Sequence, residues 1–292
     1  MLNKKAFSLI ELSVSLIIVS IIIAGVITSS RMLNEAKIAN AKTLTQGSPV
    51  ASISGLSLWL DATNDNAFDV VDPDEDRQIS TWKDTNPQSS IKRDFTQTTS
   101  NAKPIFKATG INGLPALYFD GSNDYMKISS TNIFDFTNGT GITIFMVPKI
   151  LRNLSTAQVM LFETNSERFS LQFTTTYLRF DFVSGTVGSG SIVGVSSSAI
   201  HSAATVLTFT KTTSSQSIYI NGALNHSQNG SASFSLPLNA EMALGCYSSS
   251  GTRSLFTQFN LGELIIFNRY LKTEERKAVE QYLGKKWGID VS

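Results

Sequence analysis

The chain has very little of the chemistry that cross-links exported domains or binds transition metals. Cys246 is the only cysteine among 292 residues, so an intramolecular disulfide is excluded. The only histidines are His201 and His226, which are too few and too isolated in the sequence for a zinc site. In the absence of a disulfide, we expect the stability of the fold to come from packing.

An excess of charge of one sign is also missing. The chain has 24 Lys and Arg residues against 23 Asp and Glu residues, which gives a formal net charge of +1. Proteins that bind nucleic acid usually carry a basic surface that neutralises phosphates. Nucleic acid is therefore not an expected partner.

Sequence signatures of common enzymes are absent as well. The chain has no G-x-S-x-G nucleophile elbow, no P-loop and no Cys–His pair. A retaining glycosidase needs two carboxylates about 5–5.5 Å apart, which on one strand means acids two or four residues apart. No strand predicted below has this spacing, so we expect no enzymatic activity.

What the chain does have is a long apolar run near its N-terminus. Residues 7–27 read FSLIELSVSLIIVSIIIAGVI. A helix of this length measures about 31 Å, enough to cross a hydrocarbon core of about 30 Å. The helical pattern continues to Thr45, and Gly47 and Pro49 end it. We expect a helix over 7–46, spanning a membrane over 7–27, and a linker over 47–54 that acts as a hinge.

Glu11 is the one acid inside this run. A carboxylate in a spanning helix costs on the order of 2.5–3.5 kcal/mol, so it normally has a partner or a function. If the chain is cut between Ala6 and Phe7, the new α-amino group of Phe7 is a cation at the same depth. The amine and the carboxylate could then pair between two copies of the chain packed side by side.

The first 27 residues, MLNKKAFSLIELSVSLIIVSIIIAGVI, resemble the leader and N-terminal segment of type IV pilins and type II secretion pseudopilins. The resemblance implies that a prepilin peptidase removes residues 1–6 and that Phe7 is N-methylated. It also implies that Glu11 aids assembly with other pilin subunits. Ala6 stands where the family usually has glycine, and the helix lacks the proline that many pilins carry.

Two other interpretations of this segment stay open. A secretory signal peptide would have a small-x-small cleavage site after the apolar run, and none follows here. An unprocessed signal anchor is the stronger alternative, because Lys4 and Lys5 favour a cytoplasmic N-terminus whether or not a peptidase acts. In every case we expect the bulk of the chain outside the cytoplasm. For the pilin interpretation we expect a single-pass inner-membrane anchor before assembly, with the C-terminal domain periplasmic or extracellular, and a pilus or pseudopilus after assembly.

From residue 55 onward the apolar pattern has a period of two. Leu178 and Phe180 alternate with Tyr177, Arg179 and Asp181, which is typical of a strand with one buried face. Asn221-Gly222 predicts a type I′ hairpin turn. Without intervening helical patterns, these runs predict an antiparallel β-sandwich or jelly roll. The expected strands lie at 56–62, 115–120, 142–147, 159–163, 168–173, 177–182, 205–210, 217–220, 242–247 and 261–267.

One further helix is expected at the end of the chain. Thr273 can cap it, and Val279, Tyr282, Leu283 and Trp287 lie on one apolar face that should pack on the sandwich. Trp59, Trp82 and Trp287 lie in strand or helix patterns and are expected in the core.

Several segments of this region together resemble a LamG-type, concanavalin A-like domain, which would cover 55–292. They are GLSLWLDA (55–62), ISTWKD (79–84), LPALYFDGSNDYM (114–126), SIYINGAL (217–224) and LGELIIFNRYLKTEERKAVEQYLGKKWG (261–288). The resemblance implies a jelly-roll sandwich. Domains of this type bind carbohydrate or protein, and some are purely structural.

Two groups of residues are candidates for ligands. Asp72, Asp74 and Asp76 have the alternate spacing of calcium loops, although the loop glycine and the distal glutamate of an EF-hand are missing. Asp120 could also bind a metal, but an Asp-Gly pair after a strand is more often a turn. Ca²⁺ is thus the only cofactor the sequence leaves open.

The second group consists of Tyr177, Arg179 and Tyr219, which the strand pattern places on outward faces. Aromatic rings stack on sugars and arginine donates hydrogen bonds to them, so these residues are candidates for a carbohydrate site. Ordinary polar-face residues would show the same pattern.

Together these features predict a minor type IV pilin or pseudopilin that displays a lectin-like module for adhesion or substrate contact. A sandwich about 45 Å across would crowd a filament whose helices are about 10 Å wide, which favours a minor or tip position. One alternative is a structural or secretion-system subunit whose sandwich contacts only other subunits. Another is an unprocessed, membrane-anchored surface protein.

Overall fold

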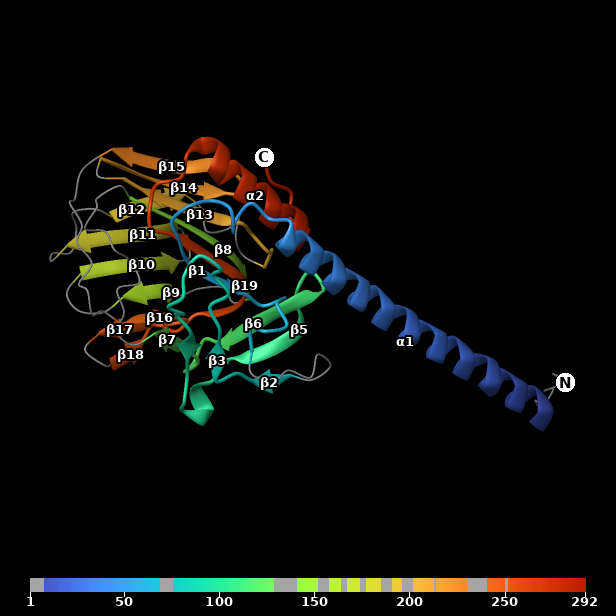
Figure 1. The fold of residues 1–292 in the computed structure, drawn as a ribbon. Coiled ribbons are helices and arrows are strands. Elements are labelled where there is room, and N and C mark those ends of the chain that lie inside the picture. Colours follow the sequence, from blue (N-terminus) through green and yellow to red (C-terminus); the bar gives the residue numbers. More distant parts are fainter. Residues whose placement is uncertain are drawn as a thin grey trace, which may run out of the picture.

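The computed structural model describes residues 8–68, 76–128, 141–151, 158–163, 167–173, 177–184, 191–195, 202–212, 214–229, 241–249 and 252–292. A long helix, α1, projects from a β-sandwich, and a second helix, α2, lies on the sandwich beside the base of α1 (Figure 1). The fold class expected from the sequence is therefore confirmed.

Helix α1 (Leu9–Gln46) has 38 residues and is about 57 Å long. Its first half exposes a mostly apolar surface, and the large apolar side chains from Leu9 to Val26 are 49–86% exposed. An 18-residue window of mean hydropathy 2.6 is long and apolar enough to cross a membrane, and none of it is buried by the rest of the protein. Such a surface is suited to contact with lipid or with other helices.

The connection after α1 is packed rather than hinged. Val50 is fully buried and Ile53 nearly so. The Gln88 side-chain amide donates to the carbonyl oxygens of Ala51 and Ile53, at 2.9 and 2.7 Å. The expectation of a hinge was wrong, because the Gly-Ser-Pro composition signals a helix end but not whether the next residues are buried.

Among the described residues, the sandwich consists of two antiparallel sheets and a small ribbon, β17 (Tyr247–Ser249) with β18 (Thr252–Ser254). A short 3₁₀ helix, η1, covers Ser100–Ala102. The nine-stranded sheet, called sheet A below, has the order β15 (Ala223–Asn229), β14 (Ser215–Ile220), β13 (Leu207–Lys211), β8 (Ile142–Ile150), β19 (Gln258–Phe267), β6 (Leu114–Asp120), β5 (Ile105–Ile111) and β2 (Arg77–Gln78), with β1 (Leu56–Asp61) pairing to β19. The eight-stranded sheet B has the order β12 (Ser191–Val195), β11 (Tyr177–Ser184), β10 (Glu167–Phe173), β9 (Gln158–Glu163), β16 (Met242–Leu244), β7 (Met126–Ile128), β4 (Phe95–Thr96) and β3 (Thr81–Trp82).

The main core fills the space between the two sheets. Phe180 of sheet B packs on Phe209 of sheet A, with ring centroids 4.9 Å apart. Leu178 and Phe180 are buried while Arg179 between them is half-buried, as the period of two predicted. Asn221 and Gly222 both have positive φ, at 50° and 81°, and join β14 to β15 in the expected two-residue turn.

A second core lies between the outer face of sheet A and the helices. Helix α2 (Thr273–Trp287) buries Val279, Leu283 and Trp287 against this face, and Trp59 from β1 joins them. The α2 packing was predicted correctly, as was the burial of all three tryptophans. Thr273 is not the cap, however. It is the first helical residue, and Glu275 accepts the N–H of Lys272 in front of it at 2.8 Å.

Candidate functional site

Among the described residues, an enclosed group of polar side chains lies where α1, β1, β19 and α2 meet. We call it the junction cluster, and it consists of Thr45, Asp61, Glu263, Tyr282 and Lys286. Asp61 and Glu263 are direct partners in the antiparallel β1–β19 pair, so their side chains leave the sheet side by side. Lys286 reaches both from the last turn of α2. The register of one strand pair and the position of one helix thus define the cluster.

Glu263 accepts four hydrogen bonds. Its Oε1 accepts from Trp59 Nε1 at 2.8 Å and from the Tyr282 hydroxyl at 2.9 Å. Its Oε2 accepts from Lys286 Nζ at 2.8 Å and from Trp287 Nε1 at 2.9 Å. Complete burial raises the pKa of Glu263, although the neighbouring Lys286 ammonium opposes this rise.

Asp61 is equally saturated. Its Oδ1 accepts the Thr63 N–H at 2.9 Å and the Thr63 hydroxyl at 2.8 Å. Its Oδ2 accepts from Lys286 Nζ at 2.7 Å and from the Thr45 hydroxyl at 3.2 Å. Since Thr45 belongs to the last turn of α1, the cluster binds the long helix directly to the sandwich.

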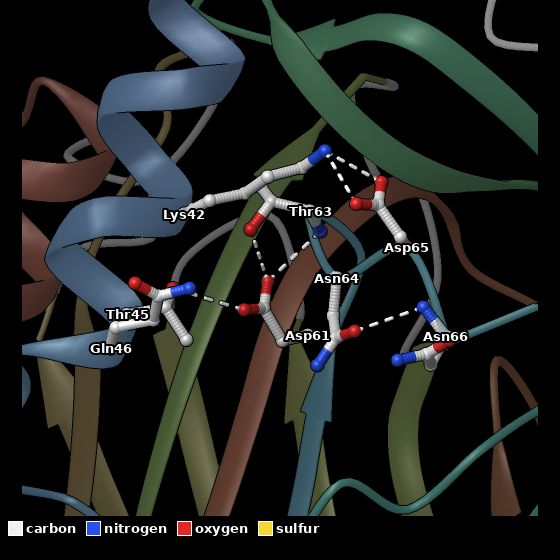
Figure 2. Close-up of a pocket in the computed structure, with 8 residues that line it drawn as sticks. All are labelled: Lys42, Thr45, Gln46, Asp61, Thr63, Asn64, Asp65 and Asn66. Carbon is white, nitrogen blue, oxygen red and sulfur yellow. Dashed lines mark hydrogen bonds and ion pairs between the residues drawn. The ribbon is translucent and has the colours of Figure 1, made fainter.

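A pocket of about 290 Å³ opens beside this cluster, between the end of α1 and the segment after β1 (Figure 2). Lys42 pairs with Asp65 across it at 2.6 Å. Both pocket carboxylates, Asp61 and Asp65, are thus already neutralised by ammonium groups, and a metal ion would have to displace both. The pocket is lined by Lys42, Thr45, Gln46, Asp61, Thr63, Asn64, Asp65 and Asn66.

The turn after β6 contains a second pair of acids. Asp120 Oδ1 accepts the N–H groups of Ser122, Asn123 and Asp124 at 2.8–3.2 Å, which makes it the turn residue that the Asp-Gly sequence suggested. Asp124 is nearly fully buried and accepts the Asp120 N–H at 3.0 Å. Burial, and then the charge of Asp120, raise the pKa of Asp124 from 3.8 to about 6.

The three carbohydrate candidates do not come together. Arg179 lies half-buried on β11 of sheet B, two residues from Tyr177, whose side chain is outside the described part of the structure. Tyr219 lies on β14 of sheet A, where the buried Arg276 of α2 stacks 3.8 Å above its ring. Because α2 covers that face of Tyr219, it cannot form one ligand surface with Arg179.

The calcium candidates are only partly covered by the described residues. Asp72 and Asp74 lie outside them. Asp76 is exposed and forms an ion pair with Lys107. In the described ranges, no group of three or more His, Cys, Asp or Glu side chains is arranged to hold a metal ion.

At the N-terminus, Ala6 and Phe7 also lie outside the described residues, but Glu11 does not. Ser8 caps α1, and its side chain accepts the Ile10 N–H at 3.3 Å. Glu11 Oε2 accepts the Ser8 N–H in return, at 2.9 Å. This reciprocal capping box satisfies backbone groups at the start of the apolar helix and gives Glu11 a local partner.

The junction cluster was missed by the sequence interpretation. Each member lies in a segment that was correctly assigned, with Glu263 inside LGELIIF and Lys286 next to Trp287. The available signal was a charged residue inside an apolar run, since such a residue needs a buried partner. For Asp61, the nearest cluster partner from the C-terminal end of the chain is Glu263, 202 positions later, and Lys286 is farther still. No local pattern can therefore identify these partners.

Two sequence families match the chain. Residues 120–275 match the Laminin_G_3 family of the concanavalin A-like lectin/glucanases superfamily. Residues 1–27 match the prokaryotic N-terminal methylation motif. No curated protein sequence matches the chain.

Solved structures with a similar fold include Trypanosoma rangeli sialidase in complex with sialic acid, at 12% identity and a TM-score of 0.55, covering 80% of this chain and 34% of the sialidase. The binding domain of botulinum neurotoxin serotype D gives 14% identity and a TM-score of 0.56, covering 82% of this chain and 53% of that structure. The receptor-binding domain of botulinum neurotoxin type G has 14% identity and a TM-score of 0.55, covering 81% of this chain and 54% of that domain. The chain spans about a third to a half of these structures, and at this identity the likeness concerns the fold alone.

The raised pKa of Asp124 predicts a specific pH dependence of stability. A carboxyl group whose folded pKa is raised stabilises the fold fully below about pH 4, and this contribution is lost as pH rises through about 6. Asp124→Asn keeps an acceptor for the Asp120 N–H but cannot ionise. Relative to the unmodified chain, this variant should gain on the order of 1–3 kcal/mol between pH 4 and pH 7.

Urea unfolding of the detergent-solubilised chain at several pH values measures this difference. Asp120→Asn is the matched control. It removes only the neighbouring charge, so its gain should have the same sign and be smaller. A difference between the chain and Asp124→Asn that does not change with pH would contradict the assignment.

Proposed function

The chain belongs to the concanavalin A-like lectin/glucanase superfamily, and from that premise we propose that it is a minor type IV pilin or pseudopilin that displays its lectin-like sandwich for adhesion or substrate contact. The observation that carries this proposal is the direct attachment of a helix with an N-methylation motif to a lectin-like sandwich. The helix provides the means of assembly, and the sandwich provides a surface to present.

The membrane half of α1 supports an assembling subunit over a simple anchor. Its exposed apolar surface fits lipid before assembly and neighbouring helices after it. Glu11 follows Phe7 by four positions in the sequence, so removal of residues 1–6 would create a cation close to it along the chain. By the positive-inside rule, Lys4 and Lys5 place the leader in the cytoplasm and the sandwich on the periplasmic or extracellular side.

The placement of the helices favours sheet B as the surface that meets a ligand. Among the described elements, α1 and α2 cover the outer face of sheet A, and no helix covers sheet B. Arg179 and Tyr177 on β11 are therefore the contact residues we propose, with calcium at the Asp72–Asp76 segment as an optional aid. Carbohydrate is the proposed ligand class, in keeping with the sialic acid complex of the similar sialidase fold. No catalytic role is proposed.

Two alternatives give different outcomes in the tests below. In the first, the sandwich contacts only other pilin subunits. In the second, the chain stays unprocessed and does not polymerise. The capping box of Ser8 and Glu11 would serve an unprocessed helix equally well, so only the chemistry at the N-terminus separates the second alternative.

The mature protein should begin at Phe7 with a methylated α-amino group. Mass spectrometry of the N-terminal peptide from purified membranes or filaments checks this, and the peptide should be absent in cells without prepilin peptidase. Recovery of the chain with Met1 or residues 2–6 still attached would rule out the pilin assignment.

Glu11→Gln should insert into the membrane at least as well as the unmodified chain but enter filaments several-fold less. Glutamine keeps an acceptor for the Ser8 N–H and removes the charge that would pair with Phe7 of a neighbour. Quantitative immunoblots of membrane and sheared-filament fractions measure both. Ser8→Ala weakens the cap and keeps the charge, so it should assemble normally. Equal incorporation of Glu11→Gln would refute the pairing.

The purified chain should bind at least one class of glycan on an array, and Arg179→Ala should lower that binding about tenfold or more, equivalent to about 1.4 kcal/mol. Tyr219→Phe is the control on the covered sheet and should bind normally. The array is run with calcium and with chelator. A blank array under both conditions would remove the carbohydrate proposal and leave the structural subunit.

A further inference from the structure

Two carboxylates and one ammonium group are enclosed together in the junction cluster. The side chains of Asp61 and Lys286 are at most 1% exposed, and that of Glu263 is fully buried. Lys286 Nζ lies 2.7 Å from Asp61 Oδ2 and 2.8 Å from Glu263 Oε2. An amine is thus held against a carboxyl group, with a second carboxylate on the same nitrogen and bulk water excluded.

Such an arrangement holds together the two groups that condense to an amide and a carboxylate that can carry protons between them. Burying charged groups is costly even when they are paired. An amide between the amine and one carboxylate removes two of the three buried charges and leaves a neutral group that hydrogen bonds can satisfy. The reacting groups are already held in contact, which removes most of the entropic cost of bringing them together.

We propose that Lys286 and Asp61 form an intramolecular isopeptide bond, with Glu263 carrying the protons. Glu263 takes one proton from the Lys286 ammonium and passes it to Oδ2 of Asp61, which leaves a neutral amine facing a neutral carboxylic acid. Nζ attacks Cγ and the C–N bond forms. Glu263 then carries a second proton from the nitrogen to Oδ2, the bond from Cγ to Oδ2 breaks, and Oδ2 leaves as water. The nitrogen keeps one proton, Glu263 is regenerated, and no oxidant or cofactor is consumed.

The hydrogen bonds on Asp61 support this division of roles between its two oxygens. Oδ1 accepts both the N–H and the hydroxyl of Thr63, so two donors are in place for the negative charge that develops on it during attack. Oδ2 contacts the amine and the Thr45 hydroxyl. The pocket beside the junction cluster is lined in part by Asp61, Thr45 and Thr63, and it offers the released water a path to solvent (Figure 2).

The bond would lie where a pulling force on α1 enters the sandwich. Asp61 ends β1, the first strand after α1, and Lys286 lies at the end of α2. In the described sheet, β1 pairs with β19 and lies off the main strand path. Tension on α1 would therefore load β1 first. A covalent link from β1 to α2 would keep β1 attached to the sandwich under that force.

Peptide mapping and intact-mass measurement of the purified full-length chain test the proposal. We expect the mass to be lower by one water molecule than the processed sequence requires, and a branched peptide that joins the segments containing Asp61 and Lys286. A succinimide at Asp120-Gly121 would give the same mass change without a branch, so the branched peptide is the deciding observation. The full mass with linear peptides only would show that these residues remain an ion pair and would overturn the proposal.

Variants assign the roles. Lys286→Arg keeps the positive charge but cannot form this amide, and Glu263→Gln removes the proton carrier, so both should give the full mass. Lys42→Arg is the matched control, because Lys42 and Asp65 are 2.6 Å apart in a solvent-exposed pair that should stay non-covalent. Loss of water in Glu263→Gln at the normal extent would refute the role of Glu263. The mapping of the unmodified chain decides the bond itself even if a variant fails to fold.

Discussion

The placement of Lys286 between Asp61 and Glu263 is the constraint on which the arrangement of the protein depends. Two carboxylates and one ammonium buried together are tolerated only if every remaining hydrogen-bonding atom is satisfied. Trp59, Tyr282 and Trp287 donate to Glu263, while Thr63 and Thr45 donate to Asp61. A shift of α2 or a slip of β1 against β19 would leave a buried charge unpaired, so the cluster selects one arrangement of these elements.

The same cluster determines how the long helix meets the sandwich. Helix α1 passes through two environments, since its first half exposes apolar side chains and its last turns are covered by the sandwich. Ala41 is buried there, Thr45 contacts both Asp61 and Tyr282, and Lys42 pairs with Asp65. Val50 and Ile53 are packed beyond the helix end, so the connection extends this contact between α1 and the sandwich.

The parts of the fold that sequence could predict are those set by neighbouring residues. Alternation in β11, the Asn221-Gly222 turn and the apolar face of α2 all depend on residues within a few positions of one another. The packed connection after α1 was mispredicted because its burial depends on Gln88, a distant residue. For the same reason the junction cluster was not predicted, since its charges come from the two ends of the domain.

Candidate ligand residues were harder still to predict. Alternation along a strand identifies which side chains point outward, but not which other elements pack on them. Tyr219 and Arg179 have the same pattern, yet α2 lies on one sheet and not on the other. The buried Arg276 stacks on Tyr219, so this aromatic ring packs beneath a helix and Arg179 remains half-buried on the opposite sheet. The cluster that fixes α2 therefore also decides which sheet can meet a ligand. Helices α1 and α2 pack on the outer face of sheet A, and among the described elements they leave the outer face of sheet B, on the far side of the core, open.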